Sequence, residues 1–396
     1  MNIFKYLMPD NPRMASLKVF YDGVDISADI SGFITSFSYT ERAKNGESDD
    51  LSITFQNIDK LWSTGWFPDR GAKIRAIIQT ENWFERNDFN QLACGEFEID
   101  DFTDSGPPAE FSIGALSVGI TSSIRGEAKN KAWENIRISE VVREFSELHG
   151  FGSYFESDYD PVIDRFDQKG ESDLEFLVKI AEYAGLQVRF SHGHIVVYRE
   201  ALYDSHAVAM TLKRNYDGII SHEFRASSAD IYTACHVQYF DSKKNKVITY
   251  QYTPDGRSGI VGDEGQTSSG GGGGGQRIDP DTRMVVTDPP KSGQKTKTEP
   301  IAEPKVGKVL KISQRCTSIA EAEQLARSKL RGKNQQEITG SITLAGHLLL
   351  QAGLVIAVSG FGRWDTGTYS IDEVNHSYSK SSGLITTISL RGVLGY

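Results

Sequence analysis

The stretch GEFEIDDFTDSG at residues 95–106 has a counterpart, GTYSIDEVNHSY, at residues 367–378. Both read glycine, any residue, an aromatic residue, any residue, isoleucine, aspartate, an acidic residue and an apolar residue. Apolar residues at every second position are typical of a β-strand with one buried face. The same strand pattern therefore stands near the beginning and near the end of one chain.

The segments around the two copies match as well. GAKIRAIIQ, starting at Gly71, precedes the front copy, and the turn SGPP and the run FSIGALS follow it. GLVIAVSG, starting at Gly353, precedes the back copy, and the turn SSG and the run ITTISL follow it. The aligned positions are Phe97 with Tyr369, Ile99 with Ile371, and Asp100 with Asp372.

This match predicts a duplication. The copies lie roughly 270 residues apart, far beyond the period of about 20–50 residues that marks a solenoid. We predict a mainly β protein with two similar β-barrels and an α+β insert between them. We also expect Gly95 and Gly367, which open the two motifs, to play equivalent roles where a side chain would crowd the turn.

The composition is that of a soluble globular protein. Of its residues, 38% are hydrophobic and 24% are charged. The length of 396 residues is enough for roughly two to four domains. The chain has no run of about 18 apolar residues, so we expect no stable membrane insertion. The N-terminal MNIFKYLMPDNPRM lacks the sustained apolar stretch of a secretory signal.

Cysteine spacing and net charge exclude further classes. Cys94, Cys235 and Cys316 are scattered without CxxC spacing, which is typical of a reducing compartment and not of a disulfide scaffold or zinc knuckle. The net charge of −10 argues against specific nucleic-acid binding, which needs Lys and Arg against the phosphates. The densest basic cluster, ARSKLRGK at 326–333, falls at the end of an expected helix, where cations favour the dipole.

Pattern changes along the chain suggest its domains. DDLSITFQN alternates Leu51, Ile53 and Phe55 with polar residues, the pattern of a half-buried strand, whereas helical patterns begin near residue 126. We predict an N-terminal arm at 1–15, a first β-barrel at 16–125, an α+β domain at 126–200, and a second β-barrel at 201–396 with a Gly/Pro-rich insertion loop at 254–304.

Two helices and a hairpin define the predicted α+β domain. The first helix places Val141, Val142, Phe145 and Leu148 on one face and meets a glycine as its stop. The second opens with serine and glutamate at the capping-box spacing of SDLEFLVKIAEYAG. The hairpin LQVRFSHGHIVVYRE, with its turn near a glycine, follows. These elements can close a small core of their own.

The insertion loop interrupts the strands of the last part. Its six consecutive glycines, Gly270 to Gly275, would lose much backbone entropy on ordering. The short RMVVT within it predicts a brief β-arm. One further helix follows, SIAEAEQLARSKLRG, with Ser318 and Glu321 as its capping box.

The ordered series of motifs resembles the late control gene D family of phage tail proteins, the baseplate hub of contractile tails. The resemblance covers nearly the whole chain except the N-terminal arm and the glycine-rich loop. Its segments are YDGVDIS at 21–27, DDLSITFQNIDKLW at 49–62, WFPDRGAKI at 66–74, CGEFEIDDFTDSGPP at 94–108, KAWEN at 131–135 and AGLVIAVSGFGRWDTGTYSIDEVNHSYS at 352–379. No single motif is chemically diagnostic.

The resemblance implies a structural role in the virion tail, with assembly in the host cytoplasm. Members of the family form homotrimers in which each subunit supplies two similar barrels, so six similar surfaces can face a six-fold tail tube above a three-fold central spike. The implied partners are the tube and spike proteins, together with the tape measure and baseplate wedge proteins as further candidates. An acidic channel surface would let DNA pass without binding it.

The sequence contains no recognisable catalytic arrangement, so we predict no enzyme, no catalytic, cofactor-binding or metal-binding residue, and no cofactor. His192 and His194 could share a face as metal ligands, but they flank a turn glycine and favour a hairpin turn. The acid pairs in DYDP at 158–161 and EIDD at 98–101 lack a partner base. The three tryptophans Trp62, Trp66 and Trp83 favour core or interface packing over a sugar platform.

Three alternatives stay open. The chain could be a wall-degrading tail-tip enzyme, which would release soluble fragments from peptidoglycan. It could bind peptidoglycan through the 126–200 unit, which would then sediment with the wall by itself. It could also be the hub of a type VI-like secretion or extracellular injection system, like the hub portion of VgrG spike proteins. A fused C-terminal β-helix would favour that reading, but this chain ends at Tyr396.

Overall fold

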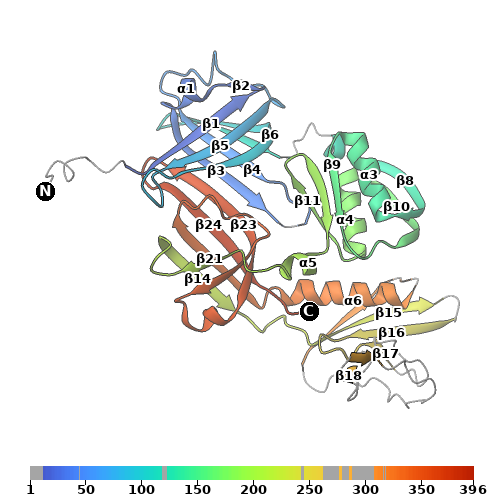
Figure 1. Cartoon of the computed structure of the whole chain (residues 1–396). Coiled ribbons are helices and arrows are strands. Elements are labelled where there is room, and N and C mark those ends of the chain that lie inside the picture. Colours follow the sequence, from blue (N-terminus) through green and yellow to red (C-terminus); the bar gives the residue numbers. More distant parts are fainter. Residues whose placement is uncertain are drawn as a thin grey trace. The chain divides into compact units, whose positions relative to one another are not determined.

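Figure 1 shows the computed structural model of the chain, which forms two compact units. The first unit combines Met1–Ile231 with Arg331–Tyr396, and the second is Tyr232–Leu330. The chain therefore leaves the first unit once and returns to it. The structure describes residues 12–43, 45–117, 123–241, 245–261, 276–278, 285–287, 307–314, 316 and 318–396.

The first half of the large sheet comes from the N-terminal part of the chain. Its strands lie in the order β3-β4-β7-β6-β5-β1, with the short β2 beyond β1. We call these strands the first sheet half. Their bounds, with a short helix, are β1 Met14–Tyr21, β2 Val24–Asp25, α1 Ser27–Ile30, β3 Ile34–Arg42, β4 Asp50–Gln56, β5 Lys73–Glu81, β6 Phe89–Ser105 and β7 Glu110–Leu116.

The second half of the sheet repeats this order. Its strands run β14-β21-β24-β23-β22-β13 along the sheet. Strands at the same position in the two halves also come in the same order along the chain. We call these strands the second sheet half. One pairing differs: β1 is antiparallel to β5, whereas β13 is parallel to β22. The bounds are β13 Met210–Lys213, β14 Ile219–Ala226, β21 Ile338–Ala345, β22 Val355–Ser359, η2 Gly362–Thr366, β23 Thr368–Ser379 and β24 Gly383–Gly392.

The repeated motif encodes a β-bulge at the same place in both halves. On β6 the register with β7 shifts between Ile99 and Asp101, and on β23 the register with β24 shifts between Ile371 and Glu373. The extra residue is the aspartate of each motif, Asp100 or Asp372. A bulge bends its strand and ends regular pairing on one side. The match between the motifs is therefore a match of backbone geometry.

A pair of backbone hydrogen bonds in front of the bulge also recurs. Gly71 donates its N–H to the carbonyl of Ile99 at 2.8 Å, and Gly353 donates to the carbonyl of Ile371 at 2.7 Å. Both glycines have positive φ, 85° and 91°. Residues with a Cβ atom pay about 1–2 kcal/mol to adopt the left-handed region. Glycine is needed at these two equivalent turns.

The expectation that Gly95 and Gly367 are equivalent is wrong. Gly95 has a φ of 103°, next to a register shift between β5 and β6. Gly367 follows η2 with a φ of −102°, which any residue can adopt, and an added Cβ would meet only the Tyr369 side chain at 3.5 Å. The reason is that Gly95 lies at an irregularity inside β6, whereas Gly367 lies between η2 and the start of β23.

Apolar alternation produces a separate core in each sheet half. Leu51, Ile53 and Phe55 of β4 are each 1% exposed, as their spacing predicted. The core of the second half includes Ile342 and Ile388, which are fully buried. In Figure 1 the blue β3 of the first half and the red β23 of the second half lie in one continuous sheet. Two similar β-barrels were expected; the strand pairing does not confirm them and shows two similar halves of one 13-stranded sheet.

The α+β insert, residues 123–204, separates the two halves in the chain. Ser172 and Glu175 form the predicted capping box: the serine hydroxyl accepts from the Glu175 N–H at 3.2 Å. Gly150 ends the first long helix with a φ of 75°. The bounds are α2 Ser123–Gly126, β8 Lys129–Arg137, α3 Ile138–His149, β9 Gly152–Glu156, β10 Val162–Glu171, α4 Asp173–Tyr183, β11 Gln187–Ser191, β12 His194–Tyr198 and α5 Glu200–Asp204.

One residue of the predicted apolar face of α3 points elsewhere. Val141, Val142 and Phe145 are buried in the core of the insert, but Leu148 is 60% exposed. The buried side chain of that last turn is His149, whose Nε2 lies 2.8 Å from the Asp173 carboxylate. A buried partner on α4 therefore draws the histidine inward, and the leucine faces out.

The second unit contains strands that were expected in the second barrel. Its sheet has the order β17-β16-β15-β20, and none of these strands joins the 13-stranded sheet. Strand periodicity cannot tell which sheet a strand enters, so 201–396 read as one unit. Ser318 caps α6 as predicted, accepting from the Glu321 N–H at 3.2 Å. The bounds are β15 Ala234–Asp241, β16 Lys246–Tyr252, β17 Gly259–Ile260, β18 Gln276–Ile278, β19 Val285–Thr287, β20 Val309–Ser313 and α6 Ile319–Asn334, whose end from Arg331 belongs to the first unit.

The predicted loop at 254–304 lies mostly outside the described residues. Within it, β19 falls on the predicted β-arm RMVVT and pairs with β18. The six glycines Gly270 to Gly275 lie outside the described residues, as does most of the predicted N-terminal arm.

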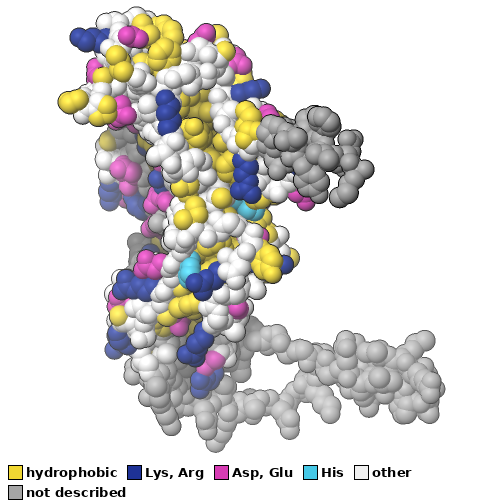
Figure 2. Space-filling view, turned by 90° about the vertical axis from the view of Figure 1, so that its left-hand side faces the viewer, with side chains coloured by type: hydrophobic (Ala, Val, Ile, Leu, Met, Phe, Trp, Pro, Cys, Tyr) yellow, Lys and Arg dark blue, Asp and Glu magenta, His cyan; other side chains and the backbone are white. Residues whose placement is uncertain are grey.

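The surface of the described residues mixes apolar and charged side chains. On the face in Figure 2, hydrophobic side chains lie exposed between interspersed basic and acidic ones. In the first sheet half, the loop between β4 and β5 exposes Ile58 by 66%, Trp66 by 41% and Phe67 by 54%. Gathered exposure of large apolar side chains often marks an interaction surface.

The glycine positions yield the first testable prediction. Gly71→Ala and Gly353→Ala should each lower the free energy of unfolding by about 1–2 kcal/mol, because alanine is strained at positive φ. Gly367→Ala is the matched control and should change stability by less than about 0.5 kcal/mol. Urea denaturation of the three variants measures these differences. Equal losses at all three positions would contradict the assignment of the equivalent turns.

Candidate functional site

The two sheet halves meet where β3 pairs antiparallel with the second part of β23. The register runs from Arg42 opposite Glu373 to Ser36 opposite Ser379. We call these two segments, 36–42 and 373–379, the seam. Before the bulge, one edge of β23 pairs with β22, and past the bulge the same edge pairs with β3. The bulge therefore permits the seam.

Polar side chains on one face of the seam hold its register. Asn375 donates through Nδ2 to the hydroxyls of Ser38 at 2.7 Å and Thr40 at 2.9 Å. Arg42 forms an ion pair with Glu373 at 3.3 Å. A shift by one residue would separate all of these partners, because neighbouring side chains point to opposite faces.

The opposite face of the seam is aromatic and buried. Phe37 stacks on Tyr378 with ring centroids 5.5 Å apart, and Tyr39 stacks on His376 at 6.2 Å. His376 is fully buried, and its Nδ1 lies 2.9 Å from the hydroxyl of Thr386. Burial lowers the pKa of His376 to about 4. The imidazole is therefore neutral at pH 7 and acts as a packing and hydrogen-bonding group.

A buried ion pair ties the insert to both sheet halves. Glu41 of β3 is 6% exposed and pairs with Arg189 of β11. The same carboxylate accepts the N–H of Ala352 at 3.1 Å, while Arg189 donates to the carbonyl of Ala352 at 3.1 Å. Ala352 precedes β22, so the three residues come from the first half, the insert and the second half. We call them the three-way lock.

The insert also docks on the loop between β3 and β4 through its backbone. Asn45 accepts from the N–H of Val188 at 2.7 Å, and Gly46 donates to the carbonyl of Val188 at 2.9 Å. Gly46 has a φ of 72°, and an added Cβ would lie 2.8 Å from a methyl of Val178. Close approach therefore requires glycine at this position.

A second buried cluster anchors the end of the insert to the second half. Asp204 accepts two hydrogen bonds from the guanidinium of Arg391, both at 2.9 Å, and also pairs with Arg331. Arg391 donates from Nε to Asp372, the bulge residue, at 2.8 Å. Burial would lower the pKa of Arg391, but its hydrogen bond to Asp204 and the charges of Glu200 and Asp372 raise it.

These two clusters line one cavity of about 490 Å³ where the insert meets the sheet. Its charged walls come from Arg189, Glu200, Asp372 and Arg391, which pair with each other or with neighbouring groups. Because these charges are already paired, the cavity walls serve to hold the parts of the chain together. The sequence carried no signal for these pairs, since their members are 19 to 191 positions apart.

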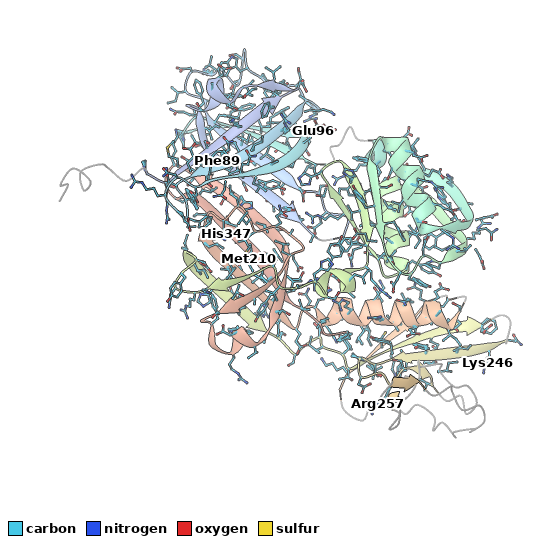
Figure 3. The ribbon with its side chains drawn as sticks, viewed as in Figure 1. Phe89, Glu96, Met210, Lys246, Arg257 and His347 are labelled. Carbon is cyan, nitrogen blue, oxygen red and sulfur yellow. The ribbon has the colours of Figure 1, made fainter. Side chains whose placement is uncertain are left out.

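Loop contacts complete the junction between the halves. The ring of Phe84, in the loop between β5 and β6, packs edge-on against His347 at 5.0 Å. His347 is labelled in Figure 3 and lies before β22 in the second half. Leu348 and Leu384 of the second half belong to the core of the first. The two halves therefore share apolar contacts as well as a strand pairing.

The histidine pair singled out by sequence forms a turn. His192 and Gly193 are the two central residues of a hairpin between β11 and β12, with φ of 49° and 76°. His194 stacks on Tyr154 at 5.0 Å. Within the described residues, no three His, Cys, Asp or Glu side chains come together in a way that could hold a metal ion.

The acid pairs of the sequence lie at turns, at a helix start and at a bulge. In DYDP, Asp160 accepts from the Ser139 hydroxyl at 2.7 Å, and Asp158 pairs with Arg199. In EIDD, the pKa of Asp100 is raised by burial and by the charge of Asp101. These groups hold turns, a helix start and a bulge.

Two of the three tryptophans pack in the core as expected. Trp62 is 5% exposed and stacks on Phe55 at 3.8 Å, and Trp83 is 8% exposed. Trp66 is 41% exposed and meets Trp62 edge-on. The indole of Trp66 is therefore available on the surface of the loop between β4 and β5.

The structure also shows where the cysteines and the basic cluster lie. Cys94, Cys235 and Cys316 are buried free thiols. Arg331 of the cluster 326–333 pairs with the buried Asp204. No helix in the described part of the chain combines the length and apolarity needed to span a membrane.

Comparison with known proteins identifies relatives along most of the chain. The family model of the phage tail baseplate hub (GPD) matches residues 125–382. A probable baseplate hub protein of Escherichia phage 186 is 23% identical over 384 residues, which cover 92% of this chain and 90% of that protein.

Solved structures share the fold. The tail protein from Neisseria meningitidis MC58 matches with a TM-score of 0.62 and 12% identity, over 95% of this chain and 96% of that one. The c3393 protein of E. coli, a component of the type VI secretion system, matches with a TM-score of 0.53 and 12% identity, over 92% of this chain and 74% of that one. These likenesses support a common architecture.

The three-way lock generates a prediction on stability. Glu41→Met or Arg189→Met alone should lower the free energy of unfolding by about 3–5 kcal/mol, because each leaves a buried charge without its partner. The double variant Glu41→Met/Arg189→Met should recover most of this loss. The exposed pair Lys73–Glu96, at 2.7 Å, is the control, and Glu96→Gln should cost less than about 1 kcal/mol. Additive losses in a double-mutant cycle would show that the lock is not a coupled unit.

Burial of His376 generates a prediction on pH dependence. The unfolded histidine takes up a proton as the pH falls below 6.5, whereas the folded one does so only near pH 4. Stability from this group is therefore present above pH 6.5 and falls by about 3 kcal/mol as the pH drops to 4. The stability difference between wild type and His376→Gln should shrink by that amount in acid.

The stability of wild type must be compared with that of His376→Gln at each pH, because Asp49 changes stability with pH in the opposite direction. Burial raises its pKa to about 6, so its contribution to stability improves as the pH falls from 6 toward 4. The exposed His206 provides the control substitution, His206→Gln. Urea denaturation between pH 7.5 and 4.5 measures the effect, and a constant difference between wild type and His376→Gln would refute it.

Proposed function

The chain belongs to the phage tail baseplate hub family, and on this premise we propose that it acts as a homotrimer that joins a six-fold tail tube to a three-fold central spike. It is a structural component of the virion tail, which we expect to assemble in the host cytoplasm. The observation that carries the proposal is the duplicated sheet half, with one strand order and one bulge position in both copies.

The duplication supports a change of symmetry. Each chain offers two similar sheet halves, so three chains around one axis offer six similar surfaces. A tube ring with six subunits could then meet six near-equivalent sites, while the trimer as a whole keeps three-fold symmetry for the spike. Cyclic arrangements of this kind use heterologous contacts, in which different patches of neighbouring subunits meet.

The charge of the chain supports a channel role. With a net charge of −10, the trimer would carry a strongly negative total charge, which discourages phosphate binding. The face in Figure 2 nevertheless mixes acidic and basic side chains. The proposal therefore requires the acidic excess to lie toward the channel. The tape measure and wedge proteins are further partners in this proposal.

The experiment that tests the proposal measures the assembled mass and its symmetry. Native mass spectrometry of the purified chain should give three times the 43.9 kDa of one chain. Mixing with the tube and spike proteins should give a complex that contains three copies of this chain. Image averages should show six similar lobes on the tube side and three on the spike side. A stable monomer or dimer in the presence of both partners would reject the proposal.

A further inference from the structure

The two sheet halves can be aligned residue by residue. Strands β3 and β14 carry their own matching bulge, since the register shifts between Ile34 and Ser36 and between Ile219 and Ser221. Equivalent hydroxyl pairs also recur: Thr54 with Ser112 at 3.0 Å, and Thr343 with Thr387 at 3.3 Å. Ser36 therefore corresponds to Ser221, and Asp101 corresponds to Glu373.

This alignment shows that each half has an edge like those in the seam. Past its bulge, β6 separates from β5, and its end from Asp101 to Ser105 pairs with β7 alone among the described strands. The equivalent part of β23 has β24 on one side and β3 on the other. The end of β6 therefore presents a free edge at the position where the equivalent part of β23 pairs with β3.

Strand β14 presents the complementary free edge. It pairs with β21 on one side, as β3 pairs with β4, but among the described strands no other strand takes its second side. In the seam, Tyr39 and Thr40 are 1% and 5% exposed. Arg225, the counterpart of Thr40, is exposed. The positions that the seam covers on β3 are therefore exposed at the equivalent place on β14.

Exposed apolar residues lie beside the free edge of β6. Phe67 of the loop between β4 and β5 packs against Phe102 at 5.3 Å, and Ser63 of the same loop donates to Asp104 at 2.6 Å. This is the loop that exposes Ile58 and Trp66. Its counterpart in the second half, between β21 and β22, carries Leu348 into the core of the first half.

We propose that the end of β6 in one copy pairs antiparallel with β14 of the neighbouring copy, in the register of the seam. This inference rests on the proposed function, because it describes how the copies of the hub join. The alignment sets the register. The opposed residues are Asp101 with Ser227, Phe102 with Ala226, Thr103 with Arg225, Asp104 with Phe224, and Ser105 with Glu223.

The side chains suit this register. Arg225 lies diagonally across from Asp101 on one face, within reach of an ion pair. In the seam, the acidic counterpart Glu373 also pairs with an arginine, the directly opposed Arg42. Phe102 lies diagonally across from Phe224 on the other face, where the seam stacks aromatic rings. Two different edges meet, so the contact is heterologous and can close a ring. It also covers edges that would otherwise invite aggregation.

A disulfide placed across the proposed pairing tests it directly. Thr103→Cys and Arg225→Cys lie opposite each other on an exposed face, close enough to bridge between copies. A mixture of the two single variants of the full chain, oxidised gently, should give a covalent dimer. The double variant should give covalent species of two and three chains. The native thiols are buried and should contribute little background.

The seam supplies a matched positive control within one chain. Asn375 and Thr40 are opposed in the seam and correspond to Thr103 and Arg225. Asn375→Cys/Thr40→Cys should therefore form a disulfide without a change of mass. The negative control pairs Thr103→Cys with Ala226→Cys, whose side chain would point to the other face of the sheet. It should bridge at least about tenfold less.

The outcomes separate this inference from the proposed function. Covalent species that end at three chains support both. A trimer by native mass that shows no bridge in the Thr103–Arg225 pair overturns the edge pairing and leaves the hub intact. A chain that stays monomeric, bridged only in the seam control, overturns both. Bridged ladders longer than three chains would keep the pairing and reject the closed trimer.

Charge reversal provides a second measurement without cysteines. Arg225→Glu or Asp101→Arg alone should raise the concentration needed for half-assembly about three- to tenfold, because each places like charges across the contact. The double variant should restore assembly to near the wild-type value. Reversal at the exposed Lys18, outside both edges, is the control. Lack of restoration in a well-folded double variant would refute the register.

Discussion

The open edge of a β-strand is the constraint on which the rest of this structure depends. A strand at the edge of a sheet presents N–H and C=O groups that need a partner. In both sheet halves, the bulge after Ile99 or Ile371 bends the central strand away from its neighbour and opens one of its sides. In the second half β3 fills that side. The join between the halves therefore follows from a single extra residue in a twelve-residue motif.

Buried charges make that join specific. Glu41 and Arg189 are both removed from water, so neither can be separated from the other without leaving an uncompensated charge. Since Ala352 shares both hydrogen bonds, the first half, the insert and the second half must come together in one arrangement. Asp204 and Arg391 impose the same condition on the end of the insert. Strand pairing supplies the contact area, and the ion pairs select the register and the partners.

The architecture shows how additions can enter a duplicated unit without changing it. The α+β insert lies between the two halves in the chain, and the second unit is inserted between β14 and β21. Neither changes the order of the six strands that the two halves have in common. For a baseplate hub this separation is useful. The repeated halves can keep similar surfaces for a symmetric partner, while the inserted units are free to differ.

Part of the fold and of the candidate site could be predicted from the sequence, because some features depend on neighbours along the chain. The alternation at Leu51, Ile53 and Phe55 placed a strand and its buried face, and the Ser172–Glu175 spacing placed the start of a helix. The equivalence of Asp100 and Asp372 was visible as a repeat, although its meaning as a bulge was not. No functional residue of the seam was predicted, because His376 and Glu41 carry no local signature.

The sequence by itself determined the duplication, the faces of the strands and the helix starts, since these follow from the period of side chains along a backbone. Only the tertiary structure decided that β15 and β16 leave the large sheet, that Leu148 faces out while His149 faces in, and that Glu41 meets Arg189. The physical reason is the same in each case. The energy of a strand edge or a buried charge depends on a partner distant in the chain, and local periodicity cannot identify that partner.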